Sequence, residues 1–352
     1  VVRLCSGQRK STCNLPIHIF MILLRFILSC WVILPGRYSV VGAQFLRIAK
    51  DSRNDALDPI WNHILPVLAS PNDRASATPL FWHIHKAGGT TVHDILASCL
   101  NLTVAAEVGV LNGHDTDQRL DLVDIDGLQY LNVDTTTEKG IQRAHDMGFH
   151  TVPRVAHVVI SPLIRSATEW LFNDQYKASM FTLIRHPVDR AVSHFYYLQT
   201  ATWEPTFNSR LAFMTLMQYA QSPFVEGDWM VRYLVGKPTG PIDEHDLEEA
   251  KTILQTKCWV GMQNHMVDSL ARFGAIYGWN QLPKWPECLE LYRGGKRRSN
   301  SNQNKPILSR ESEEWDILAQ VNQFDMKLFA FAKDLFEEQG QMYFSSFVSD
   351  SI

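Results

Sequence analysis

Two stretches of the chain gather residue types that bind anions. The first, FWHIHKAGGTT, covers residues 81–91 and closes with Lys86, Ala87, Gly88, Gly89, Thr90 and Thr91. Glycines let the backbone approach an anion closely, and the lysine adds a mobile positive charge. A helix that begins here turns its first N–H groups and its positive dipole end toward the same point. The stretch therefore predicts a phosphate-binding loop, with a tight strand-to-helix connection as the alternative.

The second stretch, RHPVDRAVSHFYY, covers residues 185–197. Arg185 follows an apolar run, and Ser193 lies eight residues later, about two helical turns into the next element. An arginine fork at the end of a strand can hold a phosphate with two hydrogen bonds, and a serine hydroxyl can add a third. The stretch predicts a second anion site. The alternative is a helix start at Pro187 with a solvated arginine.

Strands that alternate with helices must position these residues. Apolar, β-branched runs predict buried strands at 81–85, at 155–160, at 180–184 and at 258–261. Segments with helical periodicity follow at 92–100, 187–198 and 266–273, and a last long helix is predicted at 313–338. This alternation is typical of an α/β fold, in which a central parallel sheet is covered by helices on both faces.

The two stretches together resemble the cofactor motifs of carbohydrate sulfotransferases that use 3′-phosphoadenosine 5′-phosphosulfate (PAPS), such as the heparan sulfate 2-O- and 6-O-sulfotransferase group. That family carries H-I-x-K-T/A-G-G-T-S/T and, later, an R-H/D-P motif with a serine eight residues on. As in this chain, its lysine precedes the glycines, whereas the nucleotide-triphosphatase loop places the lysine after them. The resemblance covers residues 80–335 and implies a P-loop-like three-layer fold. It also implies sulfuryl transfer from PAPS to a glycan hydroxyl.

The resemblance also implies roles for individual residues. The cofactor-binding positions are Lys86, Ala87, Gly88, Gly89, Thr90, Thr91, Arg185, Ser193, Arg297 and Arg298. Lys86 would contact the phosphosulfate and its bridging oxygen, the rest of the loop would hold the 5′-phosphate, and Arg185 with Ser193 would bind the 3′-phosphate. For Arg297 and Arg298, a solvated surface turn is the stronger alternative.

The acceptor hydroxyl needs a general base, and histidine suits that task near neutral pH. His157 is the first candidate, because relatives of this kind carry a histidine on the strand before the arginine motif. Its alternative is a core histidine. His85, next to Lys86, is the second candidate. His83 and His85 have no third ligand at a recognisable spacing, so we expect no metal.

Composition and the flanking segments bear on location. The 352 residues carry a net charge of -4, which gives no general attraction to nucleic acid. Residues 1–43 are expected to be a cleaved secretory signal or a signal anchor, residues 44–79 a stem, and residues 80–345 the folded domain. These features favour the secretory pathway, and the resemblance to carbohydrate sulfotransferases implies the Golgi lumen, with the oligomeric state left open. The triplet at Asn101 is a glycosylation acceptor.

Three cysteines lie beyond the expected leader, at positions 99, 258 and 288. Their spacing fits no zinc or redox motif, which leaves either one disulfide with a free thiol or three buried thiols. Two functional alternatives also remain open. One is an inactive secreted nucleotide- or glycan-binding protein, and the other is a small-molecule kinase with a variant phosphate loop and a magnesium requirement.

Overall fold

The computed structural model describes residues 57–204, 207–293 and 307–349. The expected leader and the basic turn with Arg297 and Arg298 lie outside these described residues. Within them, no helix is both long enough and apolar enough to cross a bilayer.

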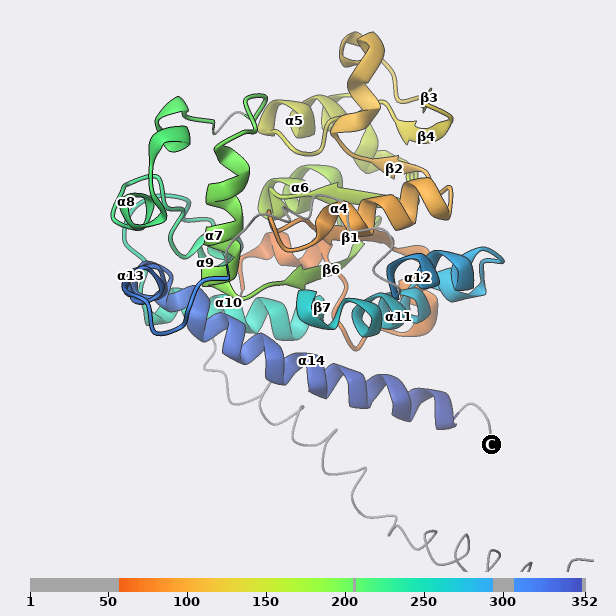
Figure 1. The fold of residues 1–352 in the computed structure, drawn as a ribbon. Helices are drawn as coiled ribbons and strands as arrows, with labels where there is room; N and C mark the ends of the chain where they lie inside the picture. Colours follow the sequence, from red (N-terminus) through yellow and green to blue (C-terminus); the bar gives the residue numbers. More distant parts are fainter. Residues whose placement is uncertain (1–56, 205–206, 294–306, 350–352) are drawn as a thin grey trace, which may run out of the picture. The chain divides into compact units, whose positions relative to one another are not determined.

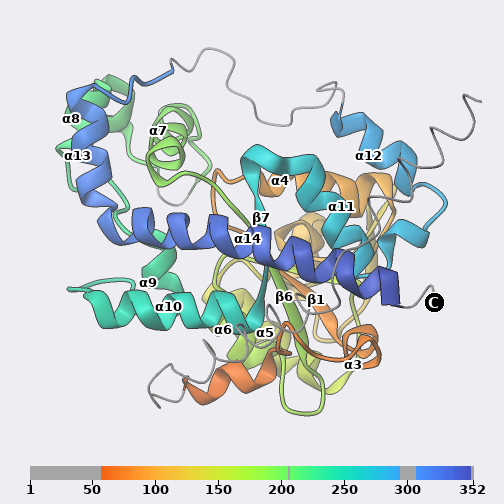
Figure 2. The same cartoon turned by 90° about the horizontal axis from the view of Figure 1, so that it is seen from below.

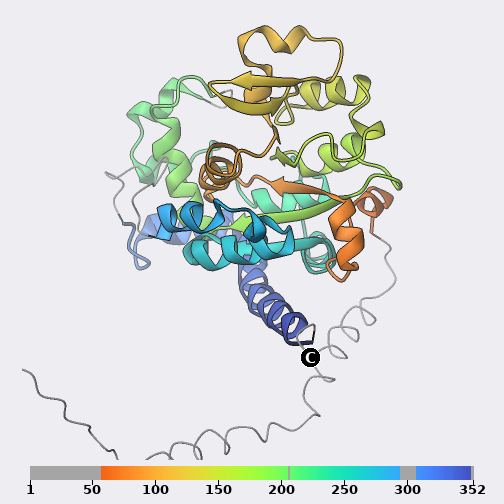
Figure 3. The same cartoon turned by 90° about the vertical axis from the view of Figure 1, so that its right-hand side faces the viewer.

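A seven-stranded sheet forms the centre, in the order β3-β4-β2-β5-β1-β6-β7 (Figures 1 and 3). The strands are β1 Thr78–Trp82, β2 Val104–Ala105, β3 Leu122–Ile125, β4 Leu128–Leu131, β5 Val158–Ser161, β6 Ala178–Ile184 and β7 Cys258–Met262. All neighbouring strands run parallel except β3 and β4. These two form a hairpin whose turn residues, Asp126 and Gly127, have φ values of 54° and 81°. Such values are typical of a two-residue hairpin turn.

Helices follow most strands along the chain. They are α3 Pro71–Ser76, α4 Gly89–His93, α5 Glu138–Asp146, α6 Ile164–Leu171, α7 Pro187–Leu198, α8 Leu216–Ala220, α9 Trp229–Val235, α10 Glu244–Lys257, α11 Met266–Ile276, α12 Trp285–Arg293, α13 Glu313–Val321 and α14 Gln323–Ser349. Short turns of other helix types fill several connections, and η2 Asp94–Cys99 continues directly from α4. Figure 2 shows α14 beside α10, with which it is in contact.

Both faces of the sheet are covered. On one face, the rings of Phe81 and Phe181 lie 5.0 Å apart, and Phe181 contacts Phe273 of α11 at 4.9 Å. On the other face, Trp82 stacks on Trp229 of α9 with 6.0 Å between ring centroids. Phe81 and Trp82 are successive strand residues, so their side chains point to opposite faces. The predicted α/β fold is confirmed, and the arrangement is compatible with three layers.

The sheet also brings the two predicted anion motifs to one edge. Trp82 of β1 pairs in parallel register with Thr182 of β6. The phosphate-loop stretch follows the carboxyl end of β1, and Arg185 follows the carboxyl end of β6. Pro187 is the first residue of α7, as predicted from its sequence position.

The folded part begins earlier than the predicted boundary at residue 80. Trp61 and Ile64 are buried, and Ile64 forms an isolated parallel bridge with Ala178. The prolines of this segment indicated a stem. However, Pro59 opens a short helical turn, where a missing N–H costs nothing. Trp61 packs beside Arg165 of α6 and Ile64 pairs with β6, so the prediction of a stem up to residue 79 is wrong for this part.

The predicted helix over 313–338 is two helices that meet at Asn322. Asp228, just before α9, accepts hydrogen bonds from the N–H groups of Phe324 and Asp325 at the start of α14. Asp325 in turn accepts from Met230 at 3.0 Å and from Val231 at 2.9 Å, at the start of α9. The two helices therefore cap each other. This exchange needs a helix start at residue 323, which apolar periodicity alone does not reveal.

One disulfide joins Cys99 at the end of η2 to Cys288 of α12. Cys258 is a buried thiol, and burial raises its pKa. Of the two open alternatives for the cysteines, the structure has one disulfide and one free thiol.

Candidate functional site

The loop between β1 and α4 is tightly folded. Lys86 and Gly88 have φ values of 63° and 102°, in the left-handed region that a non-glycine residue rarely adopts. A side chain on Gly89 would place its Cβ 2.1 Å from the His83 ring. Both glycines are therefore required by the backbone path and by the packing of His83. Among the described residues, neither Gly88 nor Gly89 donates its backbone N–H to a partner, so both groups can meet an anion.

Lys86 reaches across to α7. Its Nζ lies 3.8 Å from the centroid of the Tyr197 ring, a cation–π contact. The Tyr197 hydroxyl donates to Glu204 Oε1 at 2.5 Å. Burial, followed by the nearby Arg185, lowers the pKa of Lys86 to about 8, and Glu204 acts in the opposite direction. The ammonium is still mostly protonated at neutral pH, ready to meet an anion.

A direct hydrogen bond joins the two predicted motifs. Arg185 Nη1 donates to the backbone carbonyl of Lys86 at 2.9 Å. Burial lowers the pKa of Arg185, which stays cationic at any physiological pH. Ser193 lies on α7 four residues before Tyr197, so both share the helix face that covers Lys86. The structure thus brings Lys86, the glycine loop, Arg185 and Ser193 to one place.

His83 and His85 lie beside this loop, with 5.6 Å between their ring centroids. Burial is the main cause that lowers the pKa of His83 to about 3 and that of His85 to about 4. Both rings are therefore neutral at pH 7, and burial makes each a weaker base than a solvated imidazole. The ring of His85 also lies 5.7 Å from that of Trp229.

A charged cluster that the sequence patterns did not reveal surrounds His85. Oε2 of Glu226 lies 3.6 Å from Nη1 of Arg190 and 3.4 Å from Nδ1 of His194. Arg190 is only 1% exposed, and two of its guanidinium nitrogens have no hydrogen-bond partner. Glu226 also raises the pKa of His85 against the larger effect of burial. The signal available in the sequence was the spacing of Arg190 and His194, four residues apart on α7.

His157, the first candidate for the general base, lies elsewhere. The strand begins at Val158, so His157 precedes it rather than lying inside it. Its Nδ1 accepts a hydrogen bond from the backbone N–H of Thr103 at 2.9 Å. Ser161, at the other end of β5, pairs with Trp82, and four strand residues span about 13 Å. The structure therefore separates His157 from Lys86 by the length of a strand, and we correct its assignment.

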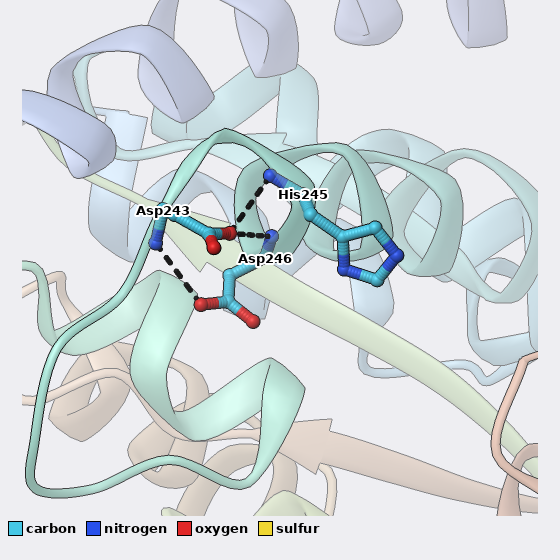
Figure 4. A group of neighbouring side chains, drawn as sticks. All are labelled: Asp243, His245 and Asp246. Atoms are coloured by element: carbon cyan, nitrogen blue, oxygen red, sulfur yellow. Dashed lines mark hydrogen bonds between the residues drawn. The ribbon is translucent and has the colours of Figure 1, made fainter.

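One group among the described residues has the geometry to hold a metal ion, namely Asp243, His245 and Asp246 (Figure 4). It is a helix cap. Asp243 Oδ1 accepts from the backbone N–H groups of His245 and Asp246, and Asp246 Oδ2 accepts from Asp243 N at 3.0 Å. The other oxygen of Asp246 pairs with Nζ of Lys237 at 2.6 Å. These bonds explain the cluster without an ion.

Comparison with known proteins adds no assignment, because no protein-family model matches the chain and no curated protein matches it significantly. The interpretation of the site therefore depends on its residues and geometry.

Proposed function

We propose that this protein is a sulfotransferase with a P-loop-like fold that moves a sulfuryl group from PAPS to a glycan hydroxyl. The observation that carries the proposal is the hydrogen bond from Arg185 to the Lys86 carbonyl, which joins two anion-binding stretches at the carboxyl ends of neighbouring strands. Ligands of open α/β sheets bind at this edge. Two adjacent anion sites suit a nucleotide that carries phosphate groups at both its 3′ and 5′ positions.

Different residues of the site bind the two phosphate groups and stabilise the charge that develops during transfer. The free N–H groups of Gly88 and Gly89 bind the 5′-phosphate, with hydroxyl groups of Thr90 and Thr91 beside them. Arg185 and Ser193 hold the 3′-phosphate. Lys86 stabilises the negative charge that develops on the phosphate oxygen as its bond to sulfur breaks and the bond from the acceptor oxygen forms.

His85 replaces His157 as the proposed base. It directly precedes Lys86 and its ring is neutral at pH 7, so it is the proposed acceptor of the proton that the acceptor hydroxyl loses, as a weaker base than a solvated imidazole. The Glu226 carboxylate favours the imidazolium that results. The disulfide between Cys99 and Cys288 supports a secretory location, because such bonds persist in oxidising compartments.

The decisive experiment replaces Lys86 and follows labelled sulfate. We expect Lys86→Ala to reduce transfer from labelled PAPS to a glycan panel by at least about 100-fold, the size typical of a lost charge-stabilising group. Lys139→Ala, which removes an exposed lysine on α5, is the matched control and should retain full activity.

Binding measurements separate the competing classes. Calorimetry of the wild type should show tighter binding of 3′-phosphoadenosine 5′-phosphate (PAP) than of ATP with magnesium. Preference for ATP would favour a kinase. Tight PAP binding without transfer to any glycan would favour a binding protein. Unchanged transfer in Lys86→Ala would overturn the proposed mechanism.

A further inference from the structure

A cavity of about 510 Å³ lies beside α9, between the segment that precedes this helix and the turn that leads to α10. Its volume falls within the range of small-molecule sites. Glu226, Trp229, Arg232 and Tyr233 contribute to its wall, together with Val321 at the end of α13. Among the described residues, the cofactor positions Lys86 to Thr91, Arg185 and Ser193 are not part of this wall, so the cavity has space for a second ligand.

One side of the cavity is an aromatic wall held in place by stacking. Trp229 is 5% exposed and lies between Trp82, at 6.0 Å, and Tyr233, at 4.0 Å between ring centroids. Trp229 therefore covers one face of Tyr233 and fixes its ring. Because Tyr233 also lines the cavity and is half-buried, it offers a rigid surface for the apolar face of a sugar ring.

The polar groups of the wall are balanced in charge. Oε2 of Glu226 faces Arg190 and His194, while 30% of the Glu226 side chain remains exposed. The guanidinium of Arg232 is engaged with the backbone, since it donates to the carbonyls of Gly227 at 3.0 Å and Gly240 at 2.7 Å. The wall thus contains the partly exposed carboxylate of Glu226 and the guanidinium of Arg232, which is bonded to backbone carbonyls of its own turn. Because the Arg232 guanidinium is already bonded to backbone carbonyls, it is less available to a ligand with several negative charges, whereas Glu226 adds a negative charge to the wall.

The cavity and the phosphate-loop edge share residues. Trp229 lies 5.7 Å from His85 between ring centroids, and the Glu226 carboxylate acts on the same imidazole. Two residues of the cavity wall are therefore neighbours of the proposed base. His85 itself does not line the cavity, so the hydroxyl of a ligand bound there would have to reach the imidazole past Trp229.

We propose that this cavity is the acceptor subsite and that it takes an uncharged, hydroxyl-rich sugar ring, stacked on Tyr233 and hydrogen-bonded to Glu226. This inference rests on the proposed sulfuryl transfer. It adds to that proposal a location for the acceptor and the charge class of the acceptor, namely a neutral glycan rather than a uronic-acid polymer.

The test compares Tyr233→Ala with Tyr233→Phe. Lactose serves as the uncharged probe and a hyaluronan tetrasaccharide as the anionic one, with labelled PAPS as donor. We expect Tyr233→Ala to raise the KM for lactose by about tenfold, the upper size of an aromatic stacking contribution. Tyr233→Phe, which keeps the ring, should stay within about twofold of the wild type. Phe213→Ala, which removes an aromatic ring that is 89% exposed elsewhere, is the control.

PAP affinity and the KM for lactose test the sulfotransferase proposal and the acceptor-site proposal separately. PAP affinity should be equal in all these variants, because Tyr233 does not touch the cofactor loop. Normal PAP binding with an unchanged lactose KM in Tyr233→Ala, or a preference for the hyaluronan tetrasaccharide, overturns the acceptor site alone. Absence of PAP binding in the wild type overturns the sulfotransferase proposal. In that case, a lactose titration followed by tryptophan fluorescence still tests whether the cavity binds a sugar. The sugar site is rejected if the fluorescence shows no saturable response, or if Tyr233→Ala responds as the wild type does.

Discussion

At the scale of single residues, neighbouring groups shift the pKa of Lys86 in opposite directions. Burial and the guanidinium of Arg185 favour the neutral amine, whereas the carboxylate of Glu204 favours the ammonium. The face of Tyr197 adds a contact that only the charged form makes well. His83 and His194 also lie close enough for the charge of Lys86 to lower the pKa of each. The free protein therefore holds a lysine that loses its proton within the range of ordinary assays.

This balance predicts a pH dependence of cofactor binding. The pKa of Lys86 is lowered to about 8, and an anion binds the protonated form. As pH rises above 8, binding must first restore the proton, so the dissociation constant of PAP should increase, by up to about tenfold per pH unit. Calorimetry between pH 6.5 and 9.5 measures this effect.

Two variants sharpen that measurement. Lys86→Arg keeps its charge over the whole range and should give a flat profile. Glu204→Gln keeps an acceptor for the Tyr197 hydroxyl but loses the negative charge, so its weakening should begin at a lower pH than in the wild type. A wild-type affinity that does not change up to pH 9.5 would contradict the assignment of Lys86 to the anion.

At the scale of elements, α9 and α14 depend on each other. Asp228 caps α14, and Asp325 caps α9 through two backbone N–H groups. Asp325 is fully buried, and burial raises its pKa to about 6, although Arg190 and the two N–H bonds act against this. The same pair of helices also supports Trp229, which borders both His85 and the cavity. Stability at this junction therefore bears directly on the candidate site.

We predict that Asp325→Ala lowers the free energy of unfolding by about 2–3 kcal/mol, because two buried N–H groups lose their acceptor. Urea unfolding measures the loss. Asp334→Ala, which replaces an exposed carboxylate on the same helix, should change stability by less than about 0.5 kcal/mol. Equal effects of the two substitutions would show that the caps contribute little.

The pH dependence of this junction has a definite sign. A carboxyl group whose pKa is raised on folding contributes stability that is complete below its unfolded pKa of about 4 and is lost as pH rises through about 6. The wild type should therefore lose stability relative to Asp325→Asn between pH 4 and pH 6. A constant difference between the two proteins over this interval would mean that Asp325 titrates normally.

At the scale of the whole molecule, the disulfide closes the longest covalent loop that the described residues show. Cys99 and Cys288 are 189 residues apart in the sequence, and their bond ties the element after the phosphate loop to α12. We predict that Cys99→Ser destabilises the fold by about 2–5 kcal/mol, through the greater freedom of the unfolded chain. Cys258→Ser, at the buried free thiol, is the comparison.

Thermal unfolding with and without reductant tests this bond. Reductant should lower the unfolding temperature of the wild type to that of Cys99→Ser and should leave the variant unchanged. Mass spectrometry after alkylation should find one free thiol among these three cysteines before reduction. Insensitivity of the wild type to reductant would show that the bond is absent or carries no stability.

The sequence by itself determined the features that depend on local pattern. Alternating strand and helix periods predicted the parallel sheet, and strand–loop–helix junctions placed Lys86 and Arg185 after strand ends. Parallel strands present their carboxyl ends at one edge, so these two residues had to lie on the same edge of the sheet, and the pairing of β1 with β6 makes them neighbours there. The backbone path through Gly88 likewise follows from residue type, since glycine adopts positive φ without strain.

The tertiary structure alone decided the features that depend on where strands start and on contacts between distant segments. His157 falls at the amino end of β5 because the strand begins at residue 158 and not at residue 155 as predicted, and Lys86 lies at the carboxyl end of the neighbouring strand. Glu226 meets His85 and Arg190 only through the packing of α7 against the segment before α9. The break between α13 and α14 at Asn322 and the disulfide between Cys99 and Cys288 also depend on contacts between segments that are distant in the sequence. Periodicity reports which face of an element is buried, but not which remote segment covers that face.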